Sequence, residues 1–196
     1  MICIIPARKG SKRLPNKNKK MLCGKPMIAY TIEAAKKSKY IDIIIVSTDD
    51  EDIAKIAKDY KVYDYKRPSE LAGDNVPMVE VLRYVIRQLP IGYPKDGRIV
   101  ELLPTSPLRI TKDIDRCIEA YMSSGFSSII TATKSINNSF RMNGSVYVTH
   151  VNIIENNDKE WDDNVGIVLM PNERSVDVDT QGDFEMAEML MEMRNE

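Results

Sequence analysis

The 196-residue sequence lacks the features that define several common classes of protein. Its three cysteines, Cys3, Cys23 and Cys117, are scattered and form no Cys-x-x-Cys pair, so neither a disulfide framework nor a zinc site is indicated. No apolar run approaches the ~18 to 20 residues of a transmembrane helix, and no secretory signal pattern is visible. We therefore expect a cytoplasmic protein that does not enter a membrane.

Glycine-rich nucleotide signatures are also missing. The sequence contains neither GxxxxGK[ST] nor GxGxxG, which excludes a Walker P-loop and disfavours a Rossmann dehydrogenase. The formal net charge is -1, and the basic residues gather in one loop without interleaved aromatic residues, which argues against nucleic-acid binding. Residues 8–25 carry eight Lys and Arg residues and no Asp or Glu, a distribution that suits a small anionic ligand.

Segments with the hydrophobic patterns of strands and helices alternate along the chain. Strands are predicted at 2–6, 41–47, 62–65, 98–103, 127–132, 145–149 and 165–170. Helices are predicted at 26–38, at 76–89, at 111–124 with Thr111 as the N-cap, and from 181 onward. A further helix is predicted to begin after an N-cap at Asp49 or Asp50. This alternation predicts an α/β fold in three layers with a mostly parallel sheet. We interpret residues 1–196 as a single domain with a short irregular insert at about 134–164.

The loop after the first predicted strand holds the strongest chemical signal. In open α/β sheets, ligands bind beyond the carboxyl ends of the strands, and this loop is the first such end. Gly10 would let the backbone approach a phosphate, and Arg8, Lys12 and Lys17 would neutralise a polyphosphate. The alternative is a solvated basic loop that only keeps the protein soluble.

This loop, IPARKGSKRLPNKN, resembles the opening signature of the acylneuraminate cytidylyltransferase family, the CMP-sialic acid synthetases. Other segments resemble that family in the same order along the chain: TIEAAKKSKYIDIIIVSTDD, RPSELAGDN, LLPTSPLR, FRMNGSVYV and SVDVDTQGDFEMAE. The resemblance implies a Rossmann-like nucleotidyltransferase fold. It also implies an enzyme that transfers CMP from CTP to a sialic-acid-like (nonulosonic) sugar and releases pyrophosphate.

The resemblance also assigns a nucleotide site. Its residues would be Arg8, Gly10, Ser11, Lys12, Lys17, Asn18, Arg67 and Asp74. Arg8 and Lys17 would be catalytic as well, with Lys17 at the α-phosphate of CTP. Structural alternatives remain for three of these residues: Asn18 as a turn residue, Arg67 in an ion pair with Glu70, and Asp74 as the cap of the helix near Val76.

Two aspartates near the end of the chain complete the predicted catalytic set. Asp177 and Asp179 are two residues apart, and on an extended segment such residues point to the same side. Paired carboxylates that face a polyphosphate are typical of a magnesium site, so Mg²⁺ is the expected cofactor. The alternative is a helix start with acids that face solvent. Asp183 is expected in the first turn of the last helix, where the helix dipole favours an acid.

The acceptor sugar would meet a second group of residues. By resemblance these are Thr105, Ser106, Arg109, Asn143 and Tyr147. The first three follow a predicted strand and so face the same crevice as the basic loop. Arg109 has the alternative of a structural ion pair, and Tyr147 that of a strand residue in the core.

Two departures from the family pattern leave the identity of the acceptor open. Leu103 stands where the family usually has a glutamine, directly before PTSPLR. The stretch between the strand at 127–132 and FRMNG is reduced to TKSINNS, whereas in the family it is longer and reaches the partner subunit. A homodimer would thereby be weakened. Two alternatives stay open: a nucleotidyltransferase for another acidic sugar or acid acceptor, and a non-catalytic nucleotide-binding protein.

Overall fold

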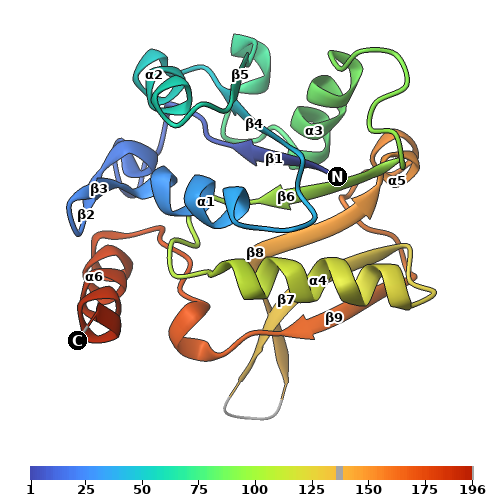
Figure 1. Ribbon diagram of the computed structural model, residues 1–196. Helices are drawn as coiled ribbons and strands as arrows, with labels where there is room; N and C mark the ends of the chain where they lie inside the picture. Colours follow the sequence, from blue (N-terminus) through green and yellow to red (C-terminus); the bar gives the residue numbers. More distant parts are fainter. Residues whose placement is uncertain (136–138, 196) are drawn as a thin grey trace.

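The computed structural model contains a seven-stranded sheet with helices on both faces (Figure 1). It describes residues 1–135 and 139–195. The strand order is β5-β4-β1-β6-β8-β7-β9, with bounds Ile2–Pro6 (β1), Ile43–Thr48 (β4), Tyr63–Lys66 (β5), Arg98–Leu102 (β6), Ser128–Lys134 (β7), Phe140–His150 (β8) and Val165–Leu169 (β9). Neighbouring strands are parallel except where β8 pairs with β6 and β7. The predicted mostly parallel sheet is therefore confirmed.

The remaining regular elements are helices and one small hairpin. The helices are Met27–Lys36 (α1), Glu51–Asp59 (α2), Met78–Arg87 (α3), Thr111–Ser123 (α4), Val151–Asn156 (α5) and Gln181–Asn195 (α6). Short 3₁₀ helices lie at Lys17–Lys19 (η1), Ser69–Leu71 (η2) and Asn172–Arg174 (η3), and Met21–Leu22 (β2) pairs with Lys25–Pro26 (β3). Within the described ranges, no helix has the length and apolar character needed to cross a bilayer.

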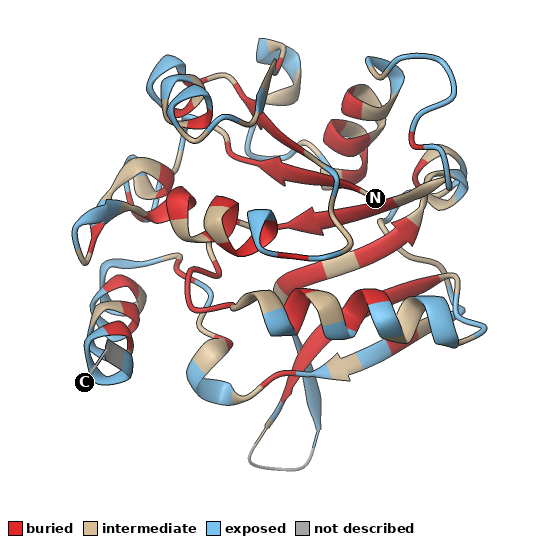
Figure 2. Cartoon of the chain, in the orientation of Figure 1, coloured by how far each residue is buried: buried red, intermediate tan, exposed pale blue. Residues whose placement is uncertain are grey.

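Two apolar clusters, one on each face of the sheet, produce the three layers. On β1, Cys3 and Ile5 belong to the cluster that includes residues of α1, α2 and α4. Ile2 and Ile4 belong to the other cluster, with residues of α3 and α5. Because successive side chains of a strand point to opposite faces, a strand covered on both faces must be apolar throughout. The complete burial of Ile2–Pro6 follows from this position in the sheet (Figure 2).

Much of the stretch predicted as an irregular insert, at about 134–164, has regular structure in its described part. β8 begins at Phe140, opposite Lys134 of β7, and α5 follows β8 directly. The first three residues of β8 are exposed, so pairing with β7 rather than burial holds them, and they show no hydrophobic pattern. Residues 136–138 of the TKSINNS stretch lie outside the described residues.

The two predicted helix caps have different outcomes. Asp50 is the N-cap of α2, and its carboxylate accepts a hydrogen bond from the N–H of Asp52 at 2.9 Å, as predicted. The predicted cap of α4 is wrong, because Thr111 is the first helical residue and Ile110 occupies the cap position. The side chain that bonds the Ile110 N–H is instead Asp113, whose carboxylate accepts it at 3.1 Å.

The C-terminal helix brings the end of the chain to the loop after β1. Phe184 and Met191 of α6 pack in one apolar cluster with Leu14, Leu22 and Val178. Figure 1 shows α6 beside the β2–β3 hairpin, at the edge of the sheet where β1 ends. The segment that precedes α6 is thereby held against the basic loop.

Candidate active site

The loop after β1 has a conformation fixed by its own backbone. Asn16 adopts the left-handed conformation with φ of 57°, and its carbonyl accepts hydrogen bonds from the N–H groups of Lys19 and Lys20, both at 3.0 Å. Asn18 is buried, and its side-chain amide donates to the carbonyl of Arg8 at 3.1 Å. Among the described residues its Oδ1 has no hydrogen-bond partner. Asn18 therefore links the two ends of the loop and is more than a turn residue.

Four cations of this loop pair with two carboxylates. Arg8 and Lys12 each lie 2.6 Å from Asp74. Lys17 lies 2.7 Å and Arg13 2.6 Å from Asp179. The ion pairs of the exposed Lys12 and Arg13 contribute only about 0 to 1 kcal/mol each, so phosphate oxygens can replace the carboxylates as partners. Lys17 is more shielded from solvent than the other cations.

Electrostatics and backbone geometry clarify two of the predicted nucleotide residues, Asp74 and Gly10. The pKa of Asp74 is lowered by hydrogen bonds from Lys12 and Arg8. The alternative role for Asp74 as a helix cap is wrong, because α3 begins at Met78 with Pro77 at its cap position. Gly10 is exposed near the tip of the loop, and a Cβ there would meet only the Arg8 guanidinium, at 3.7 Å. Steric crowding in the protein itself therefore does not require glycine at this position.

Asp177 and Asp179 of the DVDT segment line one cavity. The intervening Val178 is buried, and its N–H donates to the carbonyl of Thr105 at 2.7 Å, so the segment is held against the loop after β6. Burial raises the pKa of Asp177, and a hydrogen bond from Thr105 partly offsets that effect. Asp183 lies in the first turn of α6 as predicted, and its Oδ2 accepts the N–H of Asp179 at 3.1 Å.

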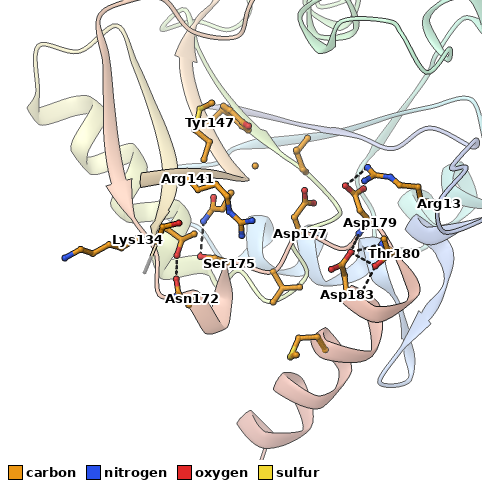
Figure 3. Close-up of a pocket in the computed structure, with 18 residues that line it drawn as sticks. Arg13, Lys134, Arg141, Tyr147, Asn172, Ser175, Asp177, Asp179, Thr180 and Asp183 are labelled. Carbon is orange, nitrogen blue, oxygen red and sulfur yellow. Dashed lines mark hydrogen bonds and ion pairs between the residues drawn. The ribbon is translucent and has the colours of Figure 1, made fainter. Parts of the chain in front are cut away.

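The cavity has a volume of 840 Å³ and lies between the β7–β8 hairpin and the segment before α6 (Figure 3). Its polar and charged lining includes Arg13, Thr133, Lys134, Arg141, Asn143, Tyr147, Asn172, Ser175, Asp177, Asp179, Thr180 and Asp183. Figure 3 shows the guanidinium of Arg141 directed into the space and the ammonium of Lys134 directed away from it. Leu103 contributes an apolar part of the wall. The cavity thus offers both a cation and carboxylates to one polar ligand.

Two predicted sugar-binding residues of β8 do line this cavity. Asn143 is buried, accepts a hydrogen bond from the hydroxyl of Thr131 at 2.6 Å and donates to Ser175 Oγ at 3.0 Å. Tyr147 stacks on Trp161, with ring centroids 5.9 Å apart and an interplanar angle of 16°. Burial raises the pKa of Tyr147. Tyr147 therefore combines the two roles considered for it, since it is partly buried in the sheet and also forms a cavity wall.

The other three predicted sugar-binding residues, Thr105, Ser106 and Arg109, are not among the cavity-lining residues. Thr105 is half-buried, and the side chains of Ser106 and Arg109 are buried. The guanidinium of Arg109 donates to the carbonyl of Ser145 at 2.6 Å and to the hydroxyl of Thr31 at 2.7 Å, and burial lowers its pKa to about 10. Its bonds go to carbonyls and a hydroxyl, and among the described residues it forms no ion pair with a carboxylate. Arg109 thus ties the loop after β6 to β8 and α1.

A second hollow, of 620 Å³, lies on the other side of the basic loop, beyond the carboxyl ends of β4 and β5. Arg67 and Asp49 are among its lining residues. Arg67 is buried, its guanidinium donates to the carbonyl of Ser47 at 2.9 Å, and burial lowers its pKa to about 10. The expected alternative, an ion pair with Glu70, does not occur among the described residues; Glu70 instead accepts a hydrogen bond from Ser69.

Sequence reasoning missed several residues of these two sites. Arg13 is part of the recognised loop motif, and its pairing with Asp179 follows only from the three-dimensional contact between the two ends of the chain. Arg141 lies within FRMNGSVYV, and the hairpin that turns it into the cavity was predicted as irregular structure. Asp49 was considered only as a helix cap, and no signal in the sequence indicated that Trp161 stacks on Tyr147.

Comparison with known proteins identifies the family. The sequence profile described as cytidylyltransferase matches residues 2–162. The chain belongs to the cytidylyltransferase family. It is therefore a nucleotidyltransferase, and the acylneuraminate cytidylyltransferase-like family expected from the sequence is confirmed.

Curated relatives and solved structures agree with this assignment. The chain is 30% identical over 230 residues to a CMP-N,N'-diacetyllegionaminic acid synthase of Legionella pneumophila, covering 100% of the chain and 98% of the relative. It is 38% identical over 136 residues to an N-acylneuraminate cytidylyltransferase of Escherichia coli, covering 69% of the chain and 32% of the relative. A CMP:2-keto-3-deoxy-manno-octonic acid synthetase complexed with CTP superposes with a TM-score of 0.75 at 15% identity, covering 98% of each chain. This last similarity shows that the fold is shared.

Proposed function

We propose that this chain transfers CMP from CTP to a sialic-acid-like nonulosonic acid and releases pyrophosphate. The observation that carries the proposal is the ion pair at 2.7 Å between Lys17 of the basic loop and Asp179, a carboxylate that lines the cavity together with Asp177. Relatives named as synthases of CMP-linked nonulosonic acids, matched over the whole chain or most of it, support the same reaction.

The two hollows suggest how the substrates lie. The nucleoside of CTP occupies the hollow at Arg67, its triphosphate lies against the basic loop with the α-phosphate at Lys17, and the acceptor occupies the cavity at Tyr147. Lys17 is largely shielded from solvent, with a side chain 15% exposed, so its charge acts strongly on a nearby phosphate. This places the α-phosphate at the boundary between the nucleotide and the acceptor.

The proposed step is an in-line displacement at the α-phosphorus. The anomeric hydroxyl oxygen of the acceptor forms a bond to phosphorus, the bond to the pyrophosphate oxygen breaks, and the hydroxyl loses its proton. Arg8 and Lys17 neutralise the charge of the phosphates, and Tyr147 and Asn143 hold the acceptor in place. Catalysis of this kind depends mainly on positioning and electrostatic stabilisation.

Asp177 and Asp179 are suited to hold Mg²⁺. Both carboxylates line the same cavity, carboxylate oxygens are the ligands that this ion prefers, and the partly buried Asp177 lacks an ion pair among the described residues. When bound, the ion would neutralise phosphate charge and help align the two substrates. Because the pKa of Asp177 is raised, we expect metal affinity to fall as the pH decreases through that raised value.

Magnesium dependence has a direct test. Removal of divalent ions with a chelator should abolish turnover, and added Mg²⁺ should restore it. Asp179→Ala should lose activity that excess Mg²⁺ only partly restores. Full turnover of the chelator-treated wild-type enzyme would contradict the metal assignment.

The acceptor half of the site supports an acidic sugar. Arg141 directs a cation into the cavity where the carboxylate of such a sugar would lie (Figure 3). Leu103 forms an apolar part of the same wall. The part of the acceptor that lies against Leu103 therefore does not depend on hydrogen bonds from a glutamine side chain. The alignment to the Legionella relative is longer than this chain, so that relative has residues without a counterpart here.

We also expect a cytoplasmic enzyme that forms a weak homodimer. Sedimentation at several protein concentrations would measure the strength of that dimer.

One assay tests the proposed function. Purified protein is incubated with Mg²⁺, each of the four nucleoside triphosphates and a panel of acidic sugars, and pyrophosphate release is followed. We expect release with CTP and a nonulosonic acid. Release with CTP and a different acidic acceptor would move the assignment to the alternative nucleotidyltransferase. Tight CTP binding without release for any acceptor would favour the non-catalytic alternative.

A further inference from the structure

The hollow beyond β4 and β5 contains a carboxylate that the predicted nucleotide site does not use. β4 and β5 are parallel with Thr48 opposite Lys66, so Asp49 and Arg67 are the residues that directly follow two adjacent strand ends. The N–H of Arg67 donates to the carbonyl of Thr48 at 2.8 Å, which fixes this arrangement. Asp49 and Arg67 both line the hollow.

Each of these two side chains has hydrogen-bonding capacity left for a ligand. Asp49 Oδ1 accepts the N–H of Lys9 at 2.8 Å, which holds the carboxylate in place, and Oδ2 has no hydrogen-bond partner in the described part of the chain. In Arg67, Nε and Nη2 donate to Ser47, and Nη1 has no hydrogen bond to any described residue. The hollow therefore presents one strong acceptor and one strong donor, each anchored by the backbone.

The acceptor of Asp49 and the donor of Arg67 together complement the hydrogen-bonding groups of cytosine but not those of uracil. Along its Watson–Crick edge cytosine carries a 4-amino donor, and N3 and O2 are acceptors, whereas uracil carries an acceptor oxygen in place of the amino group. An arginine beside the base cannot separate the two, since both have the O2 acceptor. A carboxylate can separate them, because it accepts from the amino group of cytosine and repels the O4 of uracil.

We propose that Asp49 determines the preference for cytosine, by accepting a hydrogen bond from the 4-amino group while Arg67 donates to the carbonyl oxygen. This inference rests on the proposed function, since it places the base in this hollow. It gives Asp49 a second role beyond fixing the loop at Lys9. It also explains how a nucleotide site with Arg67 as its base contact distinguishes CTP from UTP.

Asp49→Asn is the variant that separates these two roles. Its amide oxygen can still accept the Lys9 N–H, while its NH₂ group can donate to uracil O4. We expect the ratio of the Kd for UTP to the Kd for CTP, measured by calorimetric titration, to fall at least about tenfold, the loss expected for one charge-assisted hydrogen bond. An unchanged ratio would overturn the proposal. Asp59→Asn, which removes the same charge from an exposed residue at the other end of α2, is the matched control.

A ligand-side measurement keeps the proposal testable if Asp49→Asn folds poorly. The triphosphate of the pyrimidin-2-one ribonucleoside lacks the 4-amino group, and the unaltered protein should bind it about tenfold or more weakly than CTP. Equal binding of the two would overturn the assignment of an acceptor at that position. Because these are binding measurements, they give an answer whether or not the sugar acceptor of the proposed function is correct. Failure of turnover with every sugar would contradict the proposed function alone.

Discussion

At the scale of single residues, the basic loop contains cations of two kinds. The side chain of Lys12 is 84% exposed, whereas that of Lys17 is 15% exposed and lies against both Asp179 and the carbonyl of Val178. The interaction between charges strengthens as water is excluded. Lys17 should therefore interact more strongly with a bound phosphate than Lys12 does, although the sequence alone does not distinguish these two lysines.

Replacing Lys17 should remove most of the catalytic effect of the loop. We expect Lys17→Ala to lower kcat about 10²- to 10³-fold, the range typical for loss of one preorganised electrostatic group, with the circular dichroism spectrum unchanged. Lys12→Ala should have a much smaller effect on kcat and act mainly on the KM for CTP. Equal losses for the two variants would contradict the distinction drawn from their exposure.

Glu101 is a buried acid for which the proposed reaction has no role. It lies on β6 in register with Tyr147 of β8, it is 1% exposed, and neither carboxyl oxygen has a hydrogen-bond partner among the described residues. Burial, reinforced by the neighbouring Glu160, raises its pKa well above the ordinary value. A raised carboxyl pKa means that the folded state binds the proton more tightly than the unfolded state does, so stability is lost as the pH rises.

Glu101→Met should therefore stabilise the protein in a pH-dependent way. Below the ordinary glutamate pKa both states of the wild-type protein are protonated at this site, and the ionisation cost is absent. Above it, the advantage of the variant should grow by about 1.4 kcal/mol for each pH unit until the raised pKa is reached. Urea denaturation of both proteins between pH 4.5 and 8 measures this, with the exposed Glu70→Gln as control. A constant difference across that range would argue against a buried neutral carboxyl.

At the scale of elements, hydrophobic pattern predicted the strands that are buried on both faces and failed where pairing alone holds a strand. Ile2–Pro6 is apolar at every position because both faces are covered, so its sequence determines its structure. The start of β8 is exposed and is fixed by hydrogen bonds to β7, which leave no trace in composition. The same limit applies to the site. Asp177 and Asp179 could be paired from their spacing, but the approach of Arg141 and Arg13 depends on contacts between distant segments.

For Arg109, the sequence predicted the position of the loop correctly, but it did not predict the direction of the side chain. The LLPTSPLR segment does follow β6 at the binding edge, yet the guanidinium turns inward to Ser145 and Thr31. Such a group stabilises the site by fixing the elements around it. Its contribution should therefore appear in stability before it appears in substrate binding.

Arg109→Lys should lower the free energy of unfolding while leaving acceptor binding nearly unchanged. Lysine cannot reproduce the forked contacts of the guanidinium, so about 1 to 3 kcal/mol should be lost. Arg141→Lys is the matched comparison, since Arg141 lines the cavity, and it should raise the KM for the sugar without a comparable loss of stability. An increased acceptor KM for Arg109→Lys, with unchanged stability, would restore Arg109 to the sugar site.

At the scale of the whole molecule, the two ends of the chain meet at the active site. Phe184 of α6 packs with Leu14 of the basic loop, and Asp179 pairs with Lys17. The proposed catalytic groups Lys17 and Asp179 therefore come from segments near opposite ends of the sequence. Loss of the C-terminal helix would remove a part of the core and, with it, the apolar packing that holds the segment with Asp179 against the loop.

A single cooperative domain predicts one unfolding transition. Trp161 is the only tryptophan of the chain, and its stacking on Tyr147 makes its fluorescence a local probe of the acceptor side. Circular dichroism reports on the helices of the whole molecule. We expect both signals to give the same urea midpoint. Two separate midpoints would show that the acceptor side unfolds independently.

Because β1 lies between β4 and β6, both of these later strands must be synthesised before β1 can be paired on both edges. β1 pairs with β4 on one edge and with β6 on the other, although it is the first strand made. At roughly 5 to 20 residues per second, β6 is completed about 3 to 11 s after β4. During that interval one edge of an entirely apolar strand is unpaired, and such an edge is a template for joining another chain. Translation speed and chaperone supply should therefore affect the yield of this enzyme more than the stability of its finished fold does.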